Sequence, residues 1–94
     1  MSEKIEVENV NVPGQVTRVD AAKYQAMKTA MLNVMSDTPM TAAEIKEAAK
    51  AHLPDDLFPG GATSGWWAKC VQLDLEAKAV LVRHSTKPLR WSKA

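Results

Sequence analysis

The spacing of apolar and polar positions predicts two amphipathic helices in the first half of the chain. Residues 21–36 place apolar side chains on one face at helical intervals, and Asp20 is suited to cap the first turn. Thr41 and Glu44 have the spacing of a capping box, which predicts the start of a second helix. That helix ends before a loop over residues 53–63, which is interrupted by proline and glycine.

A third predicted helix, residues 64–78, is apolar around most of its circumference, so we expect it to lie at the centre of the core. Trp66 and Trp67 point about 100° apart on this helix and cannot bury against the same neighbour. Both rings could enter the core, or one could contact a partner, and we assign Trp67 to the partner. The narrow polar face consists of Gly65, Lys69, Gln72 and Glu76.

The N-terminal residues 1–19 are predicted to form an extended arm. Apolar and polar residues alternate over residues 5–12, and a Pro-Gly turn follows. Such an arm is too short to be stable alone, so it must pack on the domain or on a partner chain. Val7 and Val10 are the side chains that we expect to make a partner contact.

The C-terminal pattern predicts a strand–turn–strand hairpin over residues 80–91. A polar turn, Ser-Thr-Lys-Pro, separates its two apolar runs. We expect Val80 and Val82 to close the sheet over the helices and to lie across from Leu89 and Trp91.

The junction Leu75-Glu-Ala-Lys-Ala-Val-Leu-Val-Arg83 resembles the segment that joins the third helix to the wing in many bacterial winged-helix regulators. Those regulators usually place glycine at the position of Ala79, so we expect this turn to form without a left-handed glycine. The stretches Gly65-Trp-Trp-Ala-Lys69 and Gln72-Leu-Asp-Leu-Glu-Ala-Lys78 also resemble a family of short bacterial proteins of unassigned activity. Both resemblances imply an α+β, mainly α fold, a winged helix-turn-helix of three helices and a wing over residues 20–94.

Charge is distributed unevenly along a chain whose formal net charge is only +1. Residues 1–20 carry two basic and four acidic side chains, net −2, and residues 69–94 carry six basic and two acidic ones, net +4. This asymmetry either attracts an anionic partner or only maintains solubility. In a winged helix, the side chains near DNA would be Lys69 and Gln72 at a groove and Arg83, Lys87 and Arg90 on phosphates.

Two features of the sequence count against reading a DNA sequence. The loop between the second and third helices has about ten residues, whereas a helix-turn-helix uses three or four. Glu76 also places an anion on the polar face of the third helix, where it would point toward phosphates, while Asp74 lies off that face and can pair with Lys78.

Two functions therefore remain as hypotheses: a weak DNA-binding, transcription-regulator-like module, working as a homodimer through its arm, or a winged helix that binds another protein. No motif indicates an enzyme, a cofactor, a small-molecule substrate or a metal site. The glycines at positions 60 and 65 are spaced like a phosphate loop but lack the Lys-Ser/Thr that must follow. The single cysteine, the absence of a signal-like start and the absence of a membrane-length apolar run favour the cytoplasm.

Overall fold

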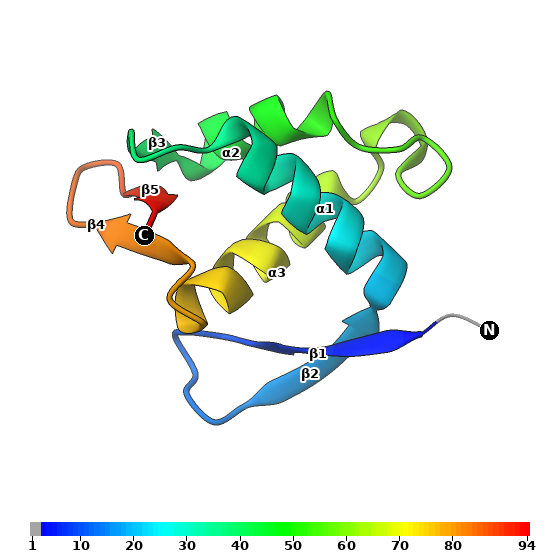
Figure 1. The fold of residues 1–94 in the computed structure, drawn as a ribbon, viewed down its shortest axis with the longest axis horizontal. Coiled ribbons are helices and arrows are strands. Elements are labelled where there is room, and N and C mark those ends of the chain that lie inside the picture. The colour runs from blue at the N-terminus through cyan, green and yellow to red at the C-terminus, as the bar shows by residue number, and fades with distance from the viewer. Residues whose placement is uncertain (1–2) are drawn as a thin grey trace.

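The computed structural model describes residues 3–94 as three helices and two small antiparallel sheets (Figure 1). The prediction of a mainly helical α+β domain is confirmed. One sheet pairs β1 with β2, and the other has the order β3-β5-β4. The elements are β1 (Lys4–Glu8), β2 (Val16–Asp20), α1 (Ala21–Val34), β3 (Met40–Thr41), α2 (Ala42–Lys50), the 3-10 turn η1 (Pro59–Gly61), α3 (Ser64–Ala77), β4 (Leu81–His84) and β5 (Arg90–Lys93).

The first two helices begin at the capping residues that the sequence predicts. The Asp20 carboxylate accepts a hydrogen bond from the backbone N–H of Lys23 at 2.9 Å. Thr41 and Glu44 form a complete capping box. The backbone N–H of Glu44 donates to Thr41 Oγ1 at 3.2 Å, and the backbone N–H of Thr41 donates to Glu44 Oε1 at 2.8 Å. Each cap satisfies N–H groups that have no partner inside the helix, which is why local sequence fixes these two boundaries.

The third helix, unlike the first two, begins without a side-chain cap. Thr63 adopts a left-handed backbone conformation with φ of 61° and makes no capping hydrogen bond. Its hydroxyl instead donates to the carbonyl of Ala62 at 2.6 Å. In α3 the buried residues are Ser64, Trp67, Ala68, Val71, Gln72, Asp74 and Leu75, as expected for a helix in the middle of the domain.

The turn from α3 into β4 is a Schellman motif centred on Ala79. The N–H of Val80 donates to the carbonyl of Leu75 at 2.8 Å, and the N–H of Ala79 donates to Glu76 at 3.1 Å. Ala79 itself has φ of 61°, so the turn forms without a glycine, as expected, yet still places a residue in the left-handed conformation. The motif needs this conformation, and an alanine adopts it at a steric cost that a glycine would not have.

The predicted pairing within the C-terminal hairpin is out of phase with the structure. Trp91 lies opposite Arg83, and Val82 lies opposite Ser92. Leu81 is the buried residue of β4, at 2% exposure, whereas Val82 is 42% exposed. Val80 belongs to the turn and not to the strand, so the alternation of β4 begins with Leu81 facing the core and Val82 facing outward.

Replacing Ala79 with glycine is expected to stabilise the protein by about 1 kcal/mol, because glycine removes the steric cost of the left-handed backbone. Urea denaturation measures the free energy of unfolding. Ala77→Gly, two residues earlier in right-handed helix, is the matched control and should lower stability by about 0.5–1 kcal/mol. Destabilisation by both variants would contradict this account of the turn.

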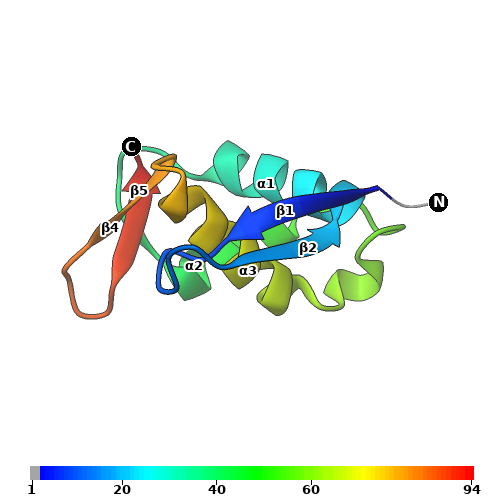
Figure 2. The ribbon, with the colours of Figure 1, turned by 90° about the horizontal axis from the view of Figure 1, so that it is seen from below.

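Residues 4–20 form a hairpin rather than an extended arm, and residues 1–2 of the predicted arm lie outside the described residues. Strand β2 pairs with β1 along its whole length, with Ile5 opposite Val19 and Val7 opposite Thr17. Val7 and Val19 are buried in the common core with all three helices. The hairpin lies along α3, as Figure 2 shows from below. The arm therefore packs on its own domain, one of the two alternatives left open by the sequence.

A buried carboxylate, Asp74 of α3, connects the hairpin to two helices. Its Oδ1 accepts a hydrogen bond from the backbone N–H of Glu8 at 2.8 Å, and its Oδ2 accepts one from the hydroxyl of Tyr24 in α1. The predicted i,i+4 pair with Lys78 is present, with Nζ 2.9 Å from Oδ1. Asp74 has 0% exposure, so these partners replace the water that its charge has lost.

The pH dependence of stability should report the bond between Tyr24 and Asp74. Burial, and then the hydrogen bond to Asp74, raise the pKa of Tyr24 well above its usual value of 10. The unfolded chain loses this proton near pH 10 and the folded chain holds it, so stability is complete below pH 10 and falls as the pH rises further. Tyr24 is the only tyrosine, so tyrosinate absorbance follows it directly. If the native protein formed tyrosinate at the same pH as the urea-unfolded chain, the pKa of Tyr24 would not be raised by folding and the prediction would be wrong.

Candidate functional site: two grooves beside the third helix

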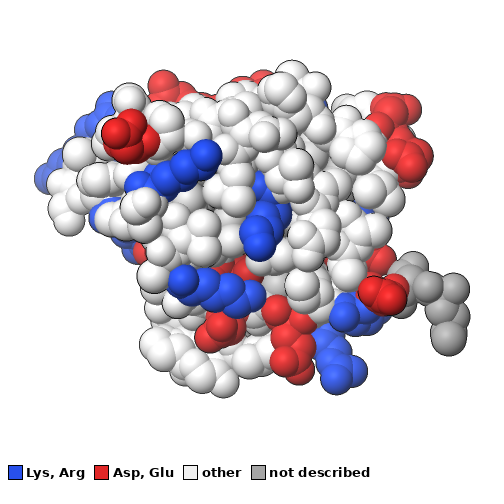
Figure 3. All heavy atoms as spheres, viewed as in Figure 1, with Lys and Arg blue, Asp and Glu red and all other residues white. Residues whose placement is uncertain are grey.

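One groove lies between α2, α3 and the hairpin formed by β4 and β5, and we call it the cationic groove. It encloses about 500 Å³. Its charged lining residues are Lys46 of α2, Lys69 of α3 and Arg83 of β4, and no carboxylate of residues 3–94 lines it. By contrast, acidic and basic side chains are mixed over the face that carries α1 and α2 in Figure 3. The groove is thus the feature to which an anion is best matched.

Arg83, predicted to contact phosphate, is half-buried and is held against the protein by Glu76. Its Nη2 donates a hydrogen bond to Glu76 Oε1 at 3.1 Å, and its Nε lies 3.0 Å from Oε2 in an ionic contact. Trp91 Nε1 donates to the same Oε1 at 2.9 Å, and the guanidinium lies 5.6 Å from the centroid of the Trp91 ring. Glu76 is therefore a neutralised partner at the edge of the core, rather than the open anion that we expected on the helix surface.

The structure brings together three of the five residues predicted to meet nucleic acid. Lys69, Gln72 and Arg83 line the cationic groove, although Gln72 is only 6% exposed. Lys87 is exposed in the turn between β4 and β5, and Arg90 is half-buried on β5, and both lie outside the lining of the groove. Lys46 is the cation that sequence reasoning missed, because its position in α2 carries no motif.

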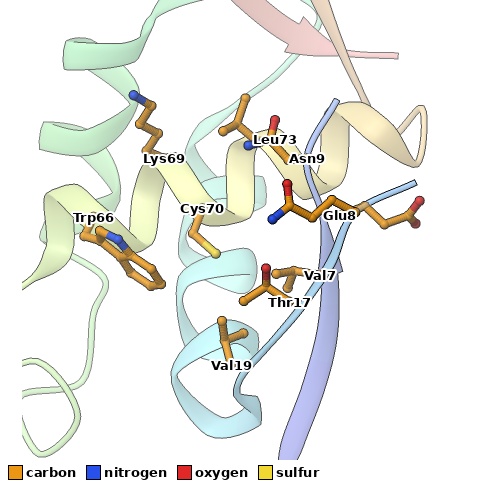
Figure 4. Close-up of a pocket in the computed structure, with 10 residues that line it drawn as sticks. Val7, Glu8, Asn9, Thr17, Val19, Trp66, Lys69, Cys70 and Leu73 are labelled. Atoms are coloured by element: carbon orange, nitrogen blue, oxygen red, sulfur yellow. The ribbon is translucent and has the colours of Figure 1, made fainter. Parts of the chain in front are cut away.

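The second groove lies between α3 and the hairpin of β1 and β2, and we call it the hairpin groove (Figure 4). It encloses about 370 Å³. Lys69 and Leu73 line both grooves, so α3 forms a ridge between them. Trp66 stands at one end of the hairpin groove and is 59% exposed.

The residues predicted at a partner interface are mostly in the core. Trp67 is 7% exposed and packs edge-on against Phe58, with ring centroids 6.4 Å apart. Val7 is 5% exposed because the hairpin folds it against the helices, and Val10 is half-buried. The exposed tryptophan is therefore Trp66. The 100° step between neighbouring helical positions indicated that the rings of Trp66 and Trp67 would point in different directions, but not which ring would face solvent.

The cysteine and the metal-ligating residue types were the remaining candidates for a chemical site in the described part of the chain. Burial, and then the charge of Asp74, raise the pKa of the Cys70 thiol, which favours the unreactive protonated form. Among residues 3–94, no three His, Cys, Asp or Glu side chains gather in a geometry suited to a metal ion. The helices described here are also too short or too polar for any of them to cross a bilayer.

These features define a small α+β domain in which a central helix separates a cationic groove from a partly apolar one. The chain belongs to the family of unknown function DUF6958, whose model matches residues 4–91. Neither the curated proteins nor the solved structures include a significant match to it.

Replacing Arg83 with alanine should cost about 2 kcal/mol of stability, because it leaves the Glu76 carboxylate largely buried with Trp91 as its remaining partner. Lys87→Ala, in the exposed turn, should change stability by less than about 0.5 kcal/mol. Urea denaturation of both variants tests the difference. If both variants changed the free energy of unfolding equally little, Arg83 would not be held by Glu76 and would be available to bind an anion.

Proposed function

We propose that this protein is a winged-helix module that binds nucleic acid through the cationic groove, mainly by contacts with phosphates. The observation that carries the proposal is the groove itself: Lys46 and Lys69 line it beside Arg83, whose charge is paired with Glu76, and no carboxylate of the described residues lines it. Phosphate contacts of this kind supply most of the affinity of non-specific nucleic-acid binding.

The arrangement of the elements supports the winged-helix assignment. A short strand, β3, follows α1 and pairs with β5, so the three-stranded sheet joins the region between the first two helices to the C-terminal hairpin. A winged helix presents its third helix and its wing to the nucleic acid. In this protein those elements carry Lys69 and the exposed Lys87, and α2 adds Lys46.

Several features favour binding without reading bases in a duplex. Gln72, the polar side chain expected to contact base edges, is buried. The segment between α2 and α3 runs from residue 51 to 63 and includes η1, unlike the tight turn of a helix-turn-helix. The exposed side chains of α3 next to the grooves are Trp66 and Lys69, and a single cation on a helix specifies no sequence.

A protein partner is the second candidate, and exposed apolar side chains favour it. Trp66 is 59% exposed and Leu89 is 43% exposed, and each lines one of the grooves. Aromatic residues are enriched where proteins contact one another. A protein or a second copy of this chain that covered these residues would leave the affinity for nucleic acid low and insensitive to salt.

The test is fluorescence anisotropy with a labelled duplex that carries a single-stranded tail, titrated with protein at several salt concentrations. The logarithm of the binding constant should fall with the logarithm of salt with a slope of about −2 to −3, as expected for three or four phosphate contacts. Lys46→Ala combined with Lys69→Ala should reduce this slope by about 1 to 2 and weaken binding about tenfold or more.

Lys4→Ala is the matched control, because Lys4 is exposed on β1 and lines neither groove. It should leave both the affinity and the slope close to those of the unaltered protein. Absence of binding at low salt would reject nucleic-acid binding and leave the protein-partner function to be tested.

A further inference from the structure

We propose that the nucleic acid bound by this protein is single-stranded, and that one unpaired base enters the hairpin groove and stacks on Trp66. The inference rests on the proposed function and specifies its ligand. It comes from the shape of the surface around α3, the support behind Trp66 and the chemistry of the hairpin groove.

The surroundings of α3 prevent it from entering a duplex as a recognition helix does. The major groove of DNA is about 12 Å wide, which accommodates one helix with its side chains. Here the β1–β2 hairpin lies along one side of α3, and α2 and the C-terminal hairpin lie on the other (Figure 2). The turn of the first hairpin reaches both grooves, with Asn9 lining one and Asn11 lining the other. A flexible single strand can follow these grooves without displacing the hairpin.

Trp66 is an exposed ring on a rigid support. It meets Trp67 edge to face, with ring centroids 5.0 Å apart and an interplanar angle of 81°. Trp67 is in turn fixed in the core against Phe58. Most of the Trp66 side chain is nevertheless open to solvent, an unfavourable state for so large an apolar surface. Stacking with a base would cover it without requiring Trp67 to move, and every base offers a flat face.

The hairpin groove has the mixed lining that a nucleobase requires. Val19, Cys70 and Leu73 supply apolar contact on its two walls (Figure 4). Asn9, Gln15 and Thr17 add side-chain groups that donate or accept hydrogen bonds, as the edges of bases do. The carboxylate of Glu8 is directed away from Trp66 in Figure 4, so it does not place a negative charge beside the stacked base.

Lys69 joins the two grooves into one path. It lines both of them and lies one helical turn from Trp66 on α3. A phosphate paired with Lys69 would lie between a base on Trp66 and the next phosphates, which would continue toward Lys46 in the cationic groove. The same two grooves would thus hold the sugar–phosphate chain on one side of α3 and a base on the other.

The experiment compares labelled oligothymidylate and oligouridylate of 20 nucleotides with a duplex of the same length, at low salt and with the full chain. Both single strands should bind at least about tenfold more tightly than the duplex. Trp66→Ala should weaken single-strand binding about tenfold, as stacking losses usually do, and leave weak duplex binding unchanged. Val82→Ala, a similarly exposed apolar position that lines neither groove, should have no effect.

A second variant protects the test against misfolding of Trp66→Ala. Trp66→Phe keeps an aromatic face, so it should bind single strands within about threefold of the unaltered protein. Single strands should also quench tryptophan fluorescence in the unaltered protein and do so much less in Trp66→Phe. Equal or tighter binding of the duplex, or binding unaffected by Trp66→Ala, would overturn the single-strand inference and leave the proposed function intact. Binding of neither form would overturn the proposed function itself.

Discussion

The arrangement of this domain depends on one buried charge, the carboxylate of Asp74. Removing a carboxylate from water is costly, and the cost is offset only where donors surround it. Here three donors surround it: the hydroxyl of Tyr24 in α1, the ammonium of Lys78 just after α3, and the backbone N–H of Glu8 in β1. The requirement to satisfy Asp74 therefore fixes where the N-terminal hairpin lies on the helices. Because that hairpin is one wall of the hairpin groove, the same requirement creates the groove.

Local sequence was sufficient to predict the parts of the fold that local interactions determine. The caps of α1 and α2 are formed by residues within three positions of each other, and the apolar girth of α3 identified it as central. Strand β2 escaped prediction because Val16, Thr17 and Arg18 are all exposed, so no alternation marks it. The phase of β4 was wrong because it depends on the backbone conformation of Ala79, which the residue type disfavours.

The site was predicted only in part, because its residues are assembled by contacts distant in sequence. Lys69, Gln72 and Arg83 line one groove, whereas Lys87 and Arg90 lie outside it, and pattern alone could not show that Arg83 would be held by Glu76 and Trp91. On a helical wheel Glu76 is simply one more polar residue. Its pairing depends on β4 and β5 returning past the end of α3, which brings positions seven and fifteen residues away against it.

The attachment of the hairpin has a consequence for motion in this protein. Few of its side chains are buried, chiefly Val7 and Val19, and one backbone bond to Asp74 joins it to α3. Segments held by so few contacts open locally at a free energy below that of global unfolding. The sulfur of Cys70 points from α3 toward these strands (Figure 4). Cys70 is half-buried beside these strands, so opening of the hairpin would expose its thiol further and speed its modification by a thiol reagent.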